Sequence, residues 1–173
     1  MTTYAALLRG VNVGGKNKVS MSALRSLMES LGHTDVTTYI QSGNVVFTAG
    51  GDVTPQSIER AIQRKFGLDV TVVLRTRAAL KKIVKANPFS GVELSKVHVG
   101  FMAAKPKPGS VAELDATQFE PEAFVIKGSD LYLYLPNGMG RTKLPAYLDR
   151  RIKTPTTVRT WNTVLKLLEL AGG

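Results

Sequence analysis

The residues best suited to chemistry lie in a glycine-rich loop near the start of the chain. From Leu7 to Lys18 the sequence reads LLRGVNVGGKNK, with three glycines, two asparagines and three cations. Glycines let backbone amides turn toward a ligand, and neighbouring cations attract anions. The expected chemistry is the binding of a phosphate or another anion. A glycine-rich surface turn without a ligand produces the same pattern, so that interpretation stays open.

The spacing of Gly10 and Lys16 matches the P-loop pattern G-x-x-x-x-G-K. A P-loop continues with Ser or Thr, which holds magnesium, and its helix starts at the Gly-Lys step. Here Asn17 follows the lysine, and the first helix signal is Ser20, a favourable N-cap. We therefore reject nucleoside triphosphate hydrolysis.

Two further segments carry polar or cationic residues next to β-prone runs. The first is Gln41-Ser42-Gly43-Asn44, a tight polar link, and the second is the loop from Asn137 to Lys143, which has two glycines. Fixed amides together with Arg and Lys suit a phosphate or carboxylate, although the second segment could also be a plain surface loop. The candidate ligand-binding residues are Arg9, Asn12, Gly14, Gly15, Lys18, Ser42, Gly43, Asn44, Arg141, Lys143 and Arg159.

The positive charge of the chain is concentrated near its two ends. The formal net charge is +10, residues 1–25 hold four basic residues and no acidic one, and residues 138–166 hold seven basic residues and one acidic one. If folding joins these segments, they form one surface that attracts anionic ligands. Alternatively, they lie on different faces and only aid solubility.

The composition is that of a globular protein. Apolar residues make up 43% of the 173 residues and charged residues 21%, and there is no cysteine. Disulfides and thiolate metal sites are therefore excluded. No apolar run approaches the roughly 20 residues that cross a bilayer, and no secretion signal stands at the N-terminus. We expect a cytoplasmic protein that does not bind membranes, with no cofactor and no metal; its oligomeric state stays open.

Support for catalysis is weak, and no catalytic residue is assigned. The two histidines, His33 and His98, have no partner at metal-ligand spacing. Glu120 and Glu122 are expected on an exposed strand edge rather than as an acid/base pair. Ser42 lacks the flanking glycines of a nucleophile elbow.

Three aromatic residues could stack on nucleic-acid bases or belong to the core. Trp161 shares a predicted helix face with leucines and a valine, which favours a core position. Tyr132 and Tyr134 share one face of a strand, as base-stacking aromatics do in RNA-binding sheets. The RNA-recognition signature is absent, and packing beneath a helix explains the two tyrosines equally well.

Hydrophobic periodicity and turn signals predict an α+β fold. The first half reads as strand, helix, two strands, helix and strand at residues 3–8, 20–31, 37–40, 45–47, 55–66 and 70–74. Thr54 is the expected N-cap of the second helix, and Gly67 is its expected end. A helix over 76–86 follows. The second half repeats the order at 96–103, from 110, 123–126, 131–135, 145–152 and 156–158, with a last helix over 160–170. Ser110 and Glu113 have the form of a capping box.

This order predicts two ferredoxin-like (β-α-β-β-α-β) subdomains with antiparallel sheets, a linking helix and a C-terminal helix. We expect the N-terminal subdomain over 1–75, a linker over 76–95 and the C-terminal subdomain over 96–173. If the first and third strands are antiparallel neighbours, the loop over 9–18 and the segment over 42–44 meet at one end of the sheet.

Several stretches together resemble a known bacterial family. They are YAALLRGVNVGG from Tyr4, VSMSAL from Val19, YIQSGNV from Tyr39 and TVRTWNTV from Thr157. The chain is thus identified as a member of the domain-of-unknown-function family 1697. The resemblance spans the chain and implies an α+β structure with ferredoxin-like subdomains, but it brings no established activity.

The function expected from the residues is binding, at a basic site, of a phosphate-bearing ligand, either a nucleotide or a single-stranded nucleic acid. One alternative is a small metal-independent enzyme that acts on an anionic metabolite. Another is a protein–protein interaction module.

Overall fold

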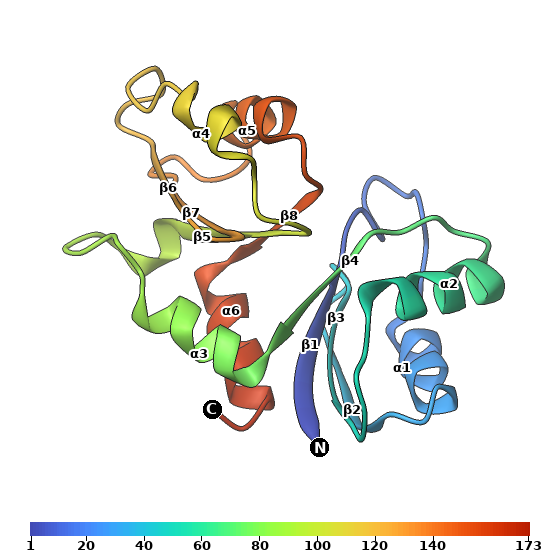
Figure 1. Ribbon diagram of the computed structural model, residues 1–173. Coiled ribbons are helices and arrows are strands. Elements are labelled where there is room, and N and C mark those ends of the chain that lie inside the picture. Colours follow the sequence, from blue (N-terminus) through green and yellow to red (C-terminus); the bar gives the residue numbers. More distant parts are fainter. The chain divides into compact units, whose positions relative to one another are not determined.

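The computed structural model describes residues 1–173 and divides them into two compact units (Figure 1). Unit 1 consists of Met1–Lys82 and Leu165–Gly173, and unit 2 of Ile83–Val164. Each unit contains one four-stranded antiparallel sheet with helices, which confirms the predicted α+β fold with two ferredoxin-like subdomains. Unit 1 also takes in the start of the expected linking helix and the last residues of the chain.

The sheet of unit 1 has the strand order β2-β3-β1-β4. Because β1 is antiparallel to both β3 and β4, the end of β1 and the start of β3 lie at the same end of the sheet, where Leu7 pairs with Asn44. The elements are β1 (Thr2–Leu8), α1 (Met21–Ser30), β2 (Thr34–Tyr39), β3 (Asn44–Ala49), α2 (Pro55–Phe66), β4 (Val72–Thr76) and α3 (Arg77–Lys85).

Local capping chemistry fixes the ends of α1 and α2 where the sequence predicts them. The Oγ of Ser20 accepts a hydrogen bond from the amide of Ala23 at 3.1 Å. The Oγ1 of Thr54 accepts one from the amide of Ser57 at 3.2 Å. Gly67 ends α2 in the left-handed conformation, with φ of 68°.

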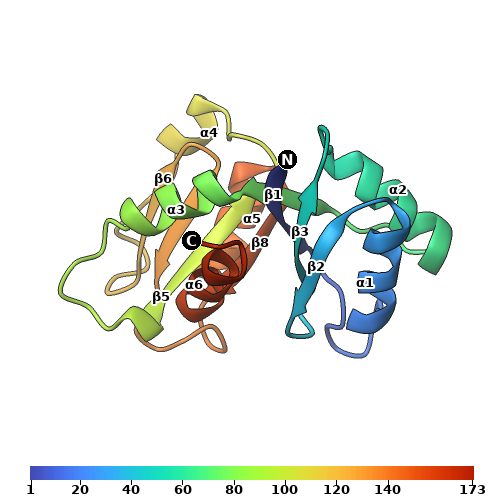
Figure 2. The ribbon, with the colours of Figure 1, turned by 90° about the horizontal axis from the view of Figure 1, so that it is seen from below.

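Both helices cover the same face of the first sheet (Figures 1 and 2). Apolar side chains from α1, α2 and alternate positions of the strands form the core of this layer, because successive strand residues point to opposite faces. Its members include Ala6, Leu8, Leu24, Met28, Val45, Phe47, Ile58 and Ile62.

Unit 2 repeats the topology with the strand order β6-β7-β5-β8. Its core lies between the sheet and α5, where leucines of β7 meet the apolar face of that helix. None of the helices combines the length and apolar character needed to cross a bilayer. The elements are the 3-10 helix η1 (Leu94–Lys96), β5 (Val97–Met102), α4 (Pro108–Ala112), β6 (Ala123–Lys127), β7 (Asp130–Tyr134), α5 (Leu144–Ile152) and β8 (Thr156–Thr160). The last helix, α6 (Trp161–Leu170), begins in unit 2, and its residues from Leu165 onward belong to unit 1.

Each sheet has an equivalent pair of backbone hydrogen bonds at the end of its central strand, β1 in the first sheet and β5 in the second. In each sheet, two consecutive amides at the end of the central strand donate hydrogen bonds. The first donates to a carbonyl of the hairpin turn, and the second donates to the carbonyl of a residue just before the edge strand on the other side. The duplicated architecture therefore extends to specific backbone contacts. The bonds are Leu8 to Gly43 at 2.8 Å, Arg9 to Thr71 at 2.9 Å, Met102 to Ser129 at 3.0 Å and Ala103 to Pro155 at 2.9 Å, each from amide to carbonyl.

Several predicted element boundaries are wrong, among them the start of β2, which lies at Thr34 and not at residue 37. The helix expected from Ser110 begins at Pro108 instead, with Lys107 as its N-cap and no side-chain capping bond. Proline at the first helical position has the φ that a helix requires, and this preference outweighs the capping-box pattern. Strand β4 begins at Val72, two residues later than expected, and the amide of Val72 donates to Oε1 of Glu59 at 2.9 Å.

Two of the three aromatic residues considered for base stacking are buried, and the third, Tyr134, is half-buried. Trp161 is 4% exposed and Tyr132 1% exposed. The hydroxyl of Tyr132 donates to the carbonyl oxygen of Ile83 in α3 at 2.7 Å. Burial, and to a lesser degree the charge of Asp130, raises the pKa of Tyr132 to about 12. The core position predicted for Trp161 is confirmed, and Tyr132 packs beneath a helix.

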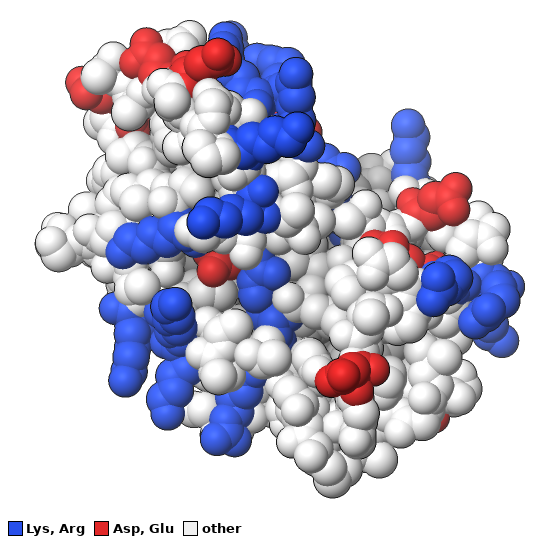
Figure 3. Space-filling view, viewed as in Figure 1, with Lys and Arg blue, Asp and Glu red and all other residues white.

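The exposed side of α3 is strongly basic. Leu80 and Ile83 are buried, while the exposed positions of the helix include Arg77, Lys81, Lys82 and Lys85. Figure 3 shows basic side chains gathered over this helix. Positive charge is therefore not confined to the two segments singled out in the sequence.

Candidate functional site

Asn12 joins the first loop (residues 9–20) to the hairpin turn (residues 40–43). Its Nδ2 donates to the carbonyl oxygens of Val19 at 2.9 Å and Gln41 at 2.8 Å, and its Oδ1 accepts from the amide of Val19 at 2.9 Å. Asn12 has φ of 54°, a left-handed conformation that asparagine tolerates better than most residues. The predicted meeting of the two segments is confirmed, and one side chain holds them together.

The tip of the first loop is closed by its own hydrogen bonds. The amide of Asn12 donates to the carbonyl of Asn17 at 3.1 Å, and that of Lys16 to the carbonyl of Val13 at 3.0 Å. The Nδ2 of Asn17 donates to the carbonyl of Gly10 at 3.1 Å. Because α1 begins only at Met21, the loop does not run from the Gly-Lys step into a helix as a P-loop does.

Gly43 allows the hairpin turn to pack directly on the first loop. Its φ is 86°, and a Cβ placed there would lie 2.6 Å from Cγ2 of Val11 and 2.9 Å from Cβ of Leu8. Both neighbours are buried. No side chain larger than hydrogen fits this position without a shift of the core, so Gly43 serves the packing of the two segments.

Asn44 is also a structural residue of the turn. It is fully buried, and its Nδ2 donates to the carbonyl of Tyr39 at 2.9 Å and to Oγ of Ser42 at 2.9 Å. A side chain with no exposed surface cannot touch a ligand in this conformation. The ligand contact predicted for Asn44 is therefore replaced by support of the turn that carries Gln41.

A cavity of about 460 Å³ lies where the first loop meets the hairpin turn. We call it the unit-1 cavity. Its lining has one cation and no carboxylate, and Ser20 places the N-terminal end of α1 beside it. The lining residues are Asn12, Gly15, Lys18, Val19, Ser20 and Gln41.

Three of the eight candidate residues in unit 1 line this cavity, namely Asn12, Gly15 and Lys18. Arg9 and Gly14 are exposed in the same loop but outside the lining. Ser42, Gly43 and Asn44 shape the turn behind it. Gln41 was not among the candidates, although its place in the polar link beside Ser42 could have indicated it.

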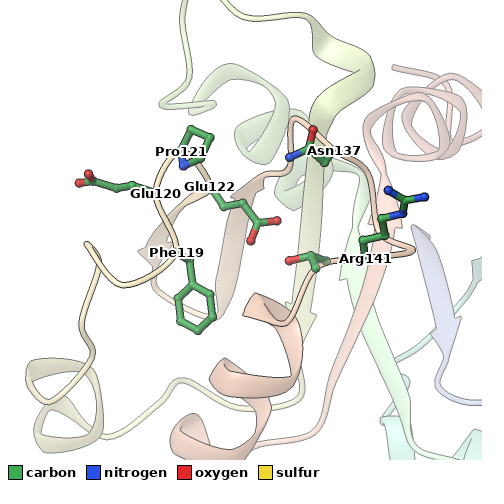
Figure 4. Close-up of a pocket in the computed structure, with 7 residues that line it drawn as sticks. Phe119, Glu120, Pro121, Glu122, Asn137 and Arg141 are labelled. Atoms are coloured by element: carbon green, nitrogen blue, oxygen red, sulfur yellow. The ribbon is translucent and has the colours of Figure 1, made fainter.

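A second cavity, of about 530 Å³, lies in unit 2 and is called the unit-2 cavity (Figure 4). It lies between the segment before β6 and the loop after β7. Because Ala123 pairs with Tyr134 in the antiparallel ladder, these two segments leave the sheet at the same end. The cavity is lined by Phe119, Glu120, Pro121, Glu122, Asn137, Arg141 and Thr142.

The three cations predicted in this half of the chain do not line one cavity. Arg141 lines the unit-2 cavity, whereas Lys143 is exposed at the start of α5 and outside the lining. Arg159 is only 7% exposed, and its Nη1 donates to Oγ1 of Thr157 at 2.6 Å and to the carbonyl of Val158 at 3.1 Å. Burial lowers the pKa of Arg159 to about 10, so it is still a cation at neutral pH.

The sequence-based expectation missed Glu122. Both Glu120 and Glu122 precede β6 rather than lying on its edge. Glu120 is exposed and points away from the cavity, while Glu122 is half-buried and points into it (Figure 4). The signal was available, because a hairpin over 123–135 brings the residues before it next to those after it.

Other titratable groups do not gather into a further site. His98 is 6% exposed, its Nδ1 has no hydrogen-bond partner, and burial lowers its pKa. No group of three or more His, Cys, Asp or Glu side chains comes together in a way that could hold a metal ion.

Comparison with known proteins places the chain among proteins without an assigned activity. A family model described as "Protein of unknown function (DUF1697)" matches residues 1–132. The structure of the conserved bacterial protein SP0830 from Streptococcus pneumoniae is similar over 98% of both chains, with 25% sequence identity and a TM-score of 0.76. No functionally curated protein matches the chain in sequence.

Proposed function

The chain belongs to the DUF1697 family of proteins of unknown function, and we propose that it binds a phosphate-bearing ligand in the unit-1 cavity. Lys18 supplies the positive charge, and Asn12 and Gly15 hold the loop that presents it. The proposal takes the cytoplasm as the compartment, as the cysteine-free sequence suggests.

The observation that carries the proposal is the charge character of this cavity. Lys18 lines it without any carboxylate in the lining, so an incoming anion meets attraction and no like charge. The N-terminal end of α1 adds to this effect, because the partial positive charge of a helix start favours anions. The first turn of α1 contains no acidic residue that would cancel it.

The size and lining favour a small ligand over a nucleic-acid strand. A cavity of about 460 Å³ is within the range of small-molecule sites. Proteins that bind single strands generally stack bases on aromatic side chains, and no aromatic residue lines this cavity. We therefore propose a nucleotide or another small phosphate compound as the ligand, with an oligonucleotide as the competing outcome.

Isothermal titration calorimetry with inorganic pyrophosphate and with ADP tests the proposal. We expect binding of at least one probe that weakens as salt rises, because salt screens exposed charges. Lys18→Gln should weaken it by about tenfold or more, the size of one charged hydrogen bond. Lys65→Gln, an exposed lysine of α2 outside the cavity, is the matched control and should leave affinity within about twofold.

Two results would contradict the proposal. One is the absence of binding by both probes at low salt. The other is an equal loss of affinity in Lys18→Gln and Lys65→Gln, which would indicate general attraction to a basic protein. Tight, salt-dependent binding of a single-stranded oligonucleotide, with pyrophosphate and ADP inert, would favour the nucleic-acid version instead.

A further inference from the structure

The unit-2 cavity differs in charge character from the unit-1 cavity. Its lining includes two glutamates, Glu120 and Glu122, and one arginine, Arg141. Only the Glu122 carboxylate points into the cavity, and Arg141 lies on the opposite wall (Figure 4). No ion pair joins them, and neither side chain takes part in a hydrogen bond within the protein. Two opposite charges that share one cavity without neutralising each other leave room for a ligand that contacts both.

The backbone around Glu122 is fixed by local contacts. Its amide donates to the carbonyl of Phe119 at 2.9 Å. The ring of Phe119 packs on that of Tyr147 in α5, with ring centroids 4.9 Å apart and the planes inclined at 54°. The hydroxyl of Tyr147 in turn accepts from the amide of Asp115 at 3.0 Å. The carboxylate therefore projects from an anchored segment, which favours a defined ligand position.

The opposite wall is anchored in the same way. Oγ1 of Thr142 accepts from the amide of Leu144 at 3.1 Å, which ties the loop to the start of α5. The amide of Gly138 donates to the carbonyl of Leu135 at 3.0 Å and closes the turn after β7. Asn137 directly precedes Gly138 in this loop. Its side chain makes no hydrogen bond in the protein and lies beside the carboxylate of Glu122 (Figure 4). Its amide group can donate to one part of a ligand and accept from another.

We propose that the unit-2 cavity binds a small zwitterion, an amino acid or a short peptide. The ammonium group pairs with Glu122, the carboxylate pairs with Arg141, and Asn137 hydrogen bonds between them. A half-buried carboxylate that takes up an ammonium group regains the hydrogen bonds that it lost with water. A phosphate compound is disfavoured here, because Glu122 would repel it. The site is independent of the unit-1 cavity.

The test is a titration of the whole chain with each proteinogenic L-amino acid and with L-alanyl-L-alanine, followed by backbone amide NMR. We expect at least one to shift the amides of residues 119–122 and 137–142 saturably. Its N-acetyl form lacks the ammonium group, and its amide form lacks the carboxylate. The affinity of each form should be lower by about tenfold or more.

Variants assign the two charges. Glu122→Gln should abolish the preference for the free ammonium, and Arg141→Gln the preference for the free carboxylate. Glu113→Gln and Lys143→Gln, at exposed positions outside the cavity lining, should keep both preferences. All four side chains make no hydrogen bond in the protein, so folding should persist and the amide spectrum checks it. The proposal is overturned if no probe binds, if the shifts fall elsewhere, or if blocked forms bind as well as the zwitterion.

Discussion

Gly43 gives the sharpest prediction about how the unit-1 cavity is built. In Gly43→Ala, the new Cβ would lie 2.6 Å from Cγ2 of Val11 and 2.9 Å from Cβ of Leu8. Carbon atoms in contact normally stay about 3.5–4.0 Å apart. The turn cannot easily retreat, because the carbonyl of Gly43 accepts a hydrogen bond from the amide of Leu8 at 2.8 Å.

The expected cost has two parts. The left-handed φ of 86° penalises any residue with a Cβ by roughly 1–2 kcal/mol. Forcing a methyl group into a packed core adds about 1–3 kcal/mol. The free energy of unfolding should therefore fall by roughly 2–5 kcal/mol, a large part of the stability of a typical domain.

Gly14→Ala is the matched control. Gly14 has φ of 58°, but a Cβ there meets no atom within 4 Å, so only the conformational cost of roughly 1–2 kcal/mol applies. Urea denaturation followed by circular dichroism compares the variants, with an unchanged slope as the check for an unchanged unfolding transition. If Gly43→Ala costs no more than Gly14→Ala, the two segments do not pack as described.

Three further predictions concern single interactions. Asn12→Ala should lower the free energy of unfolding by about 3 kcal/mol, about 1 kcal/mol for each of its three hydrogen bonds; a loss below about 1 kcal/mol in urea denaturation would mean that the side chain does not join the loops. Tyr132→Phe should cost about 1 kcal/mol through its lost bond to Ile83, and a similar loss in Tyr134→Phe, whose hydroxyl has no such partner, would refute that assignment. Burial lowers the pKa of both His33 and His98 below 6.5, so the unfolded chain binds protons more readily and stability should fall as pH drops through and below 6.5. Replacing both histidines by Gln should flatten that part of the stability curve, and an unchanged curve would show that other groups cause it.

Local chemistry made much of the fold predictable. Ser20 and Thr54 are predicted N-caps because their hydroxyls satisfy amides a few residues away, and Gly67 is a predicted helix end for the same local reason. The alternation of apolar residues gave the order of strands and helices in both halves. Competition between local signals led to the error at Ser110, where Pro108 decides the helix start.

The sites were less predictable because they depend on pairing between distant segments. The roles of Gly43 and Asn44 follow from how closely the turn packs on Leu8 and Val11, which no local pattern reveals. Arg159 was expected to face a ligand, but its side chain lies on the buried face of β8. Glu122 and Arg141 line the same cavity only because β6 pairs with β7.

The central claim is that the unit-1 cavity binds phosphate groups, and amide NMR during a pyrophosphate titration tests it most directly. The account predicts saturable shifts centred on the amides of residues 12–22 and on Gln41, which are lost in Lys18→Gln and retained in Lys65→Gln. Shifts spread evenly over the basic surface, including α3, or no shifts at low salt, would contradict it.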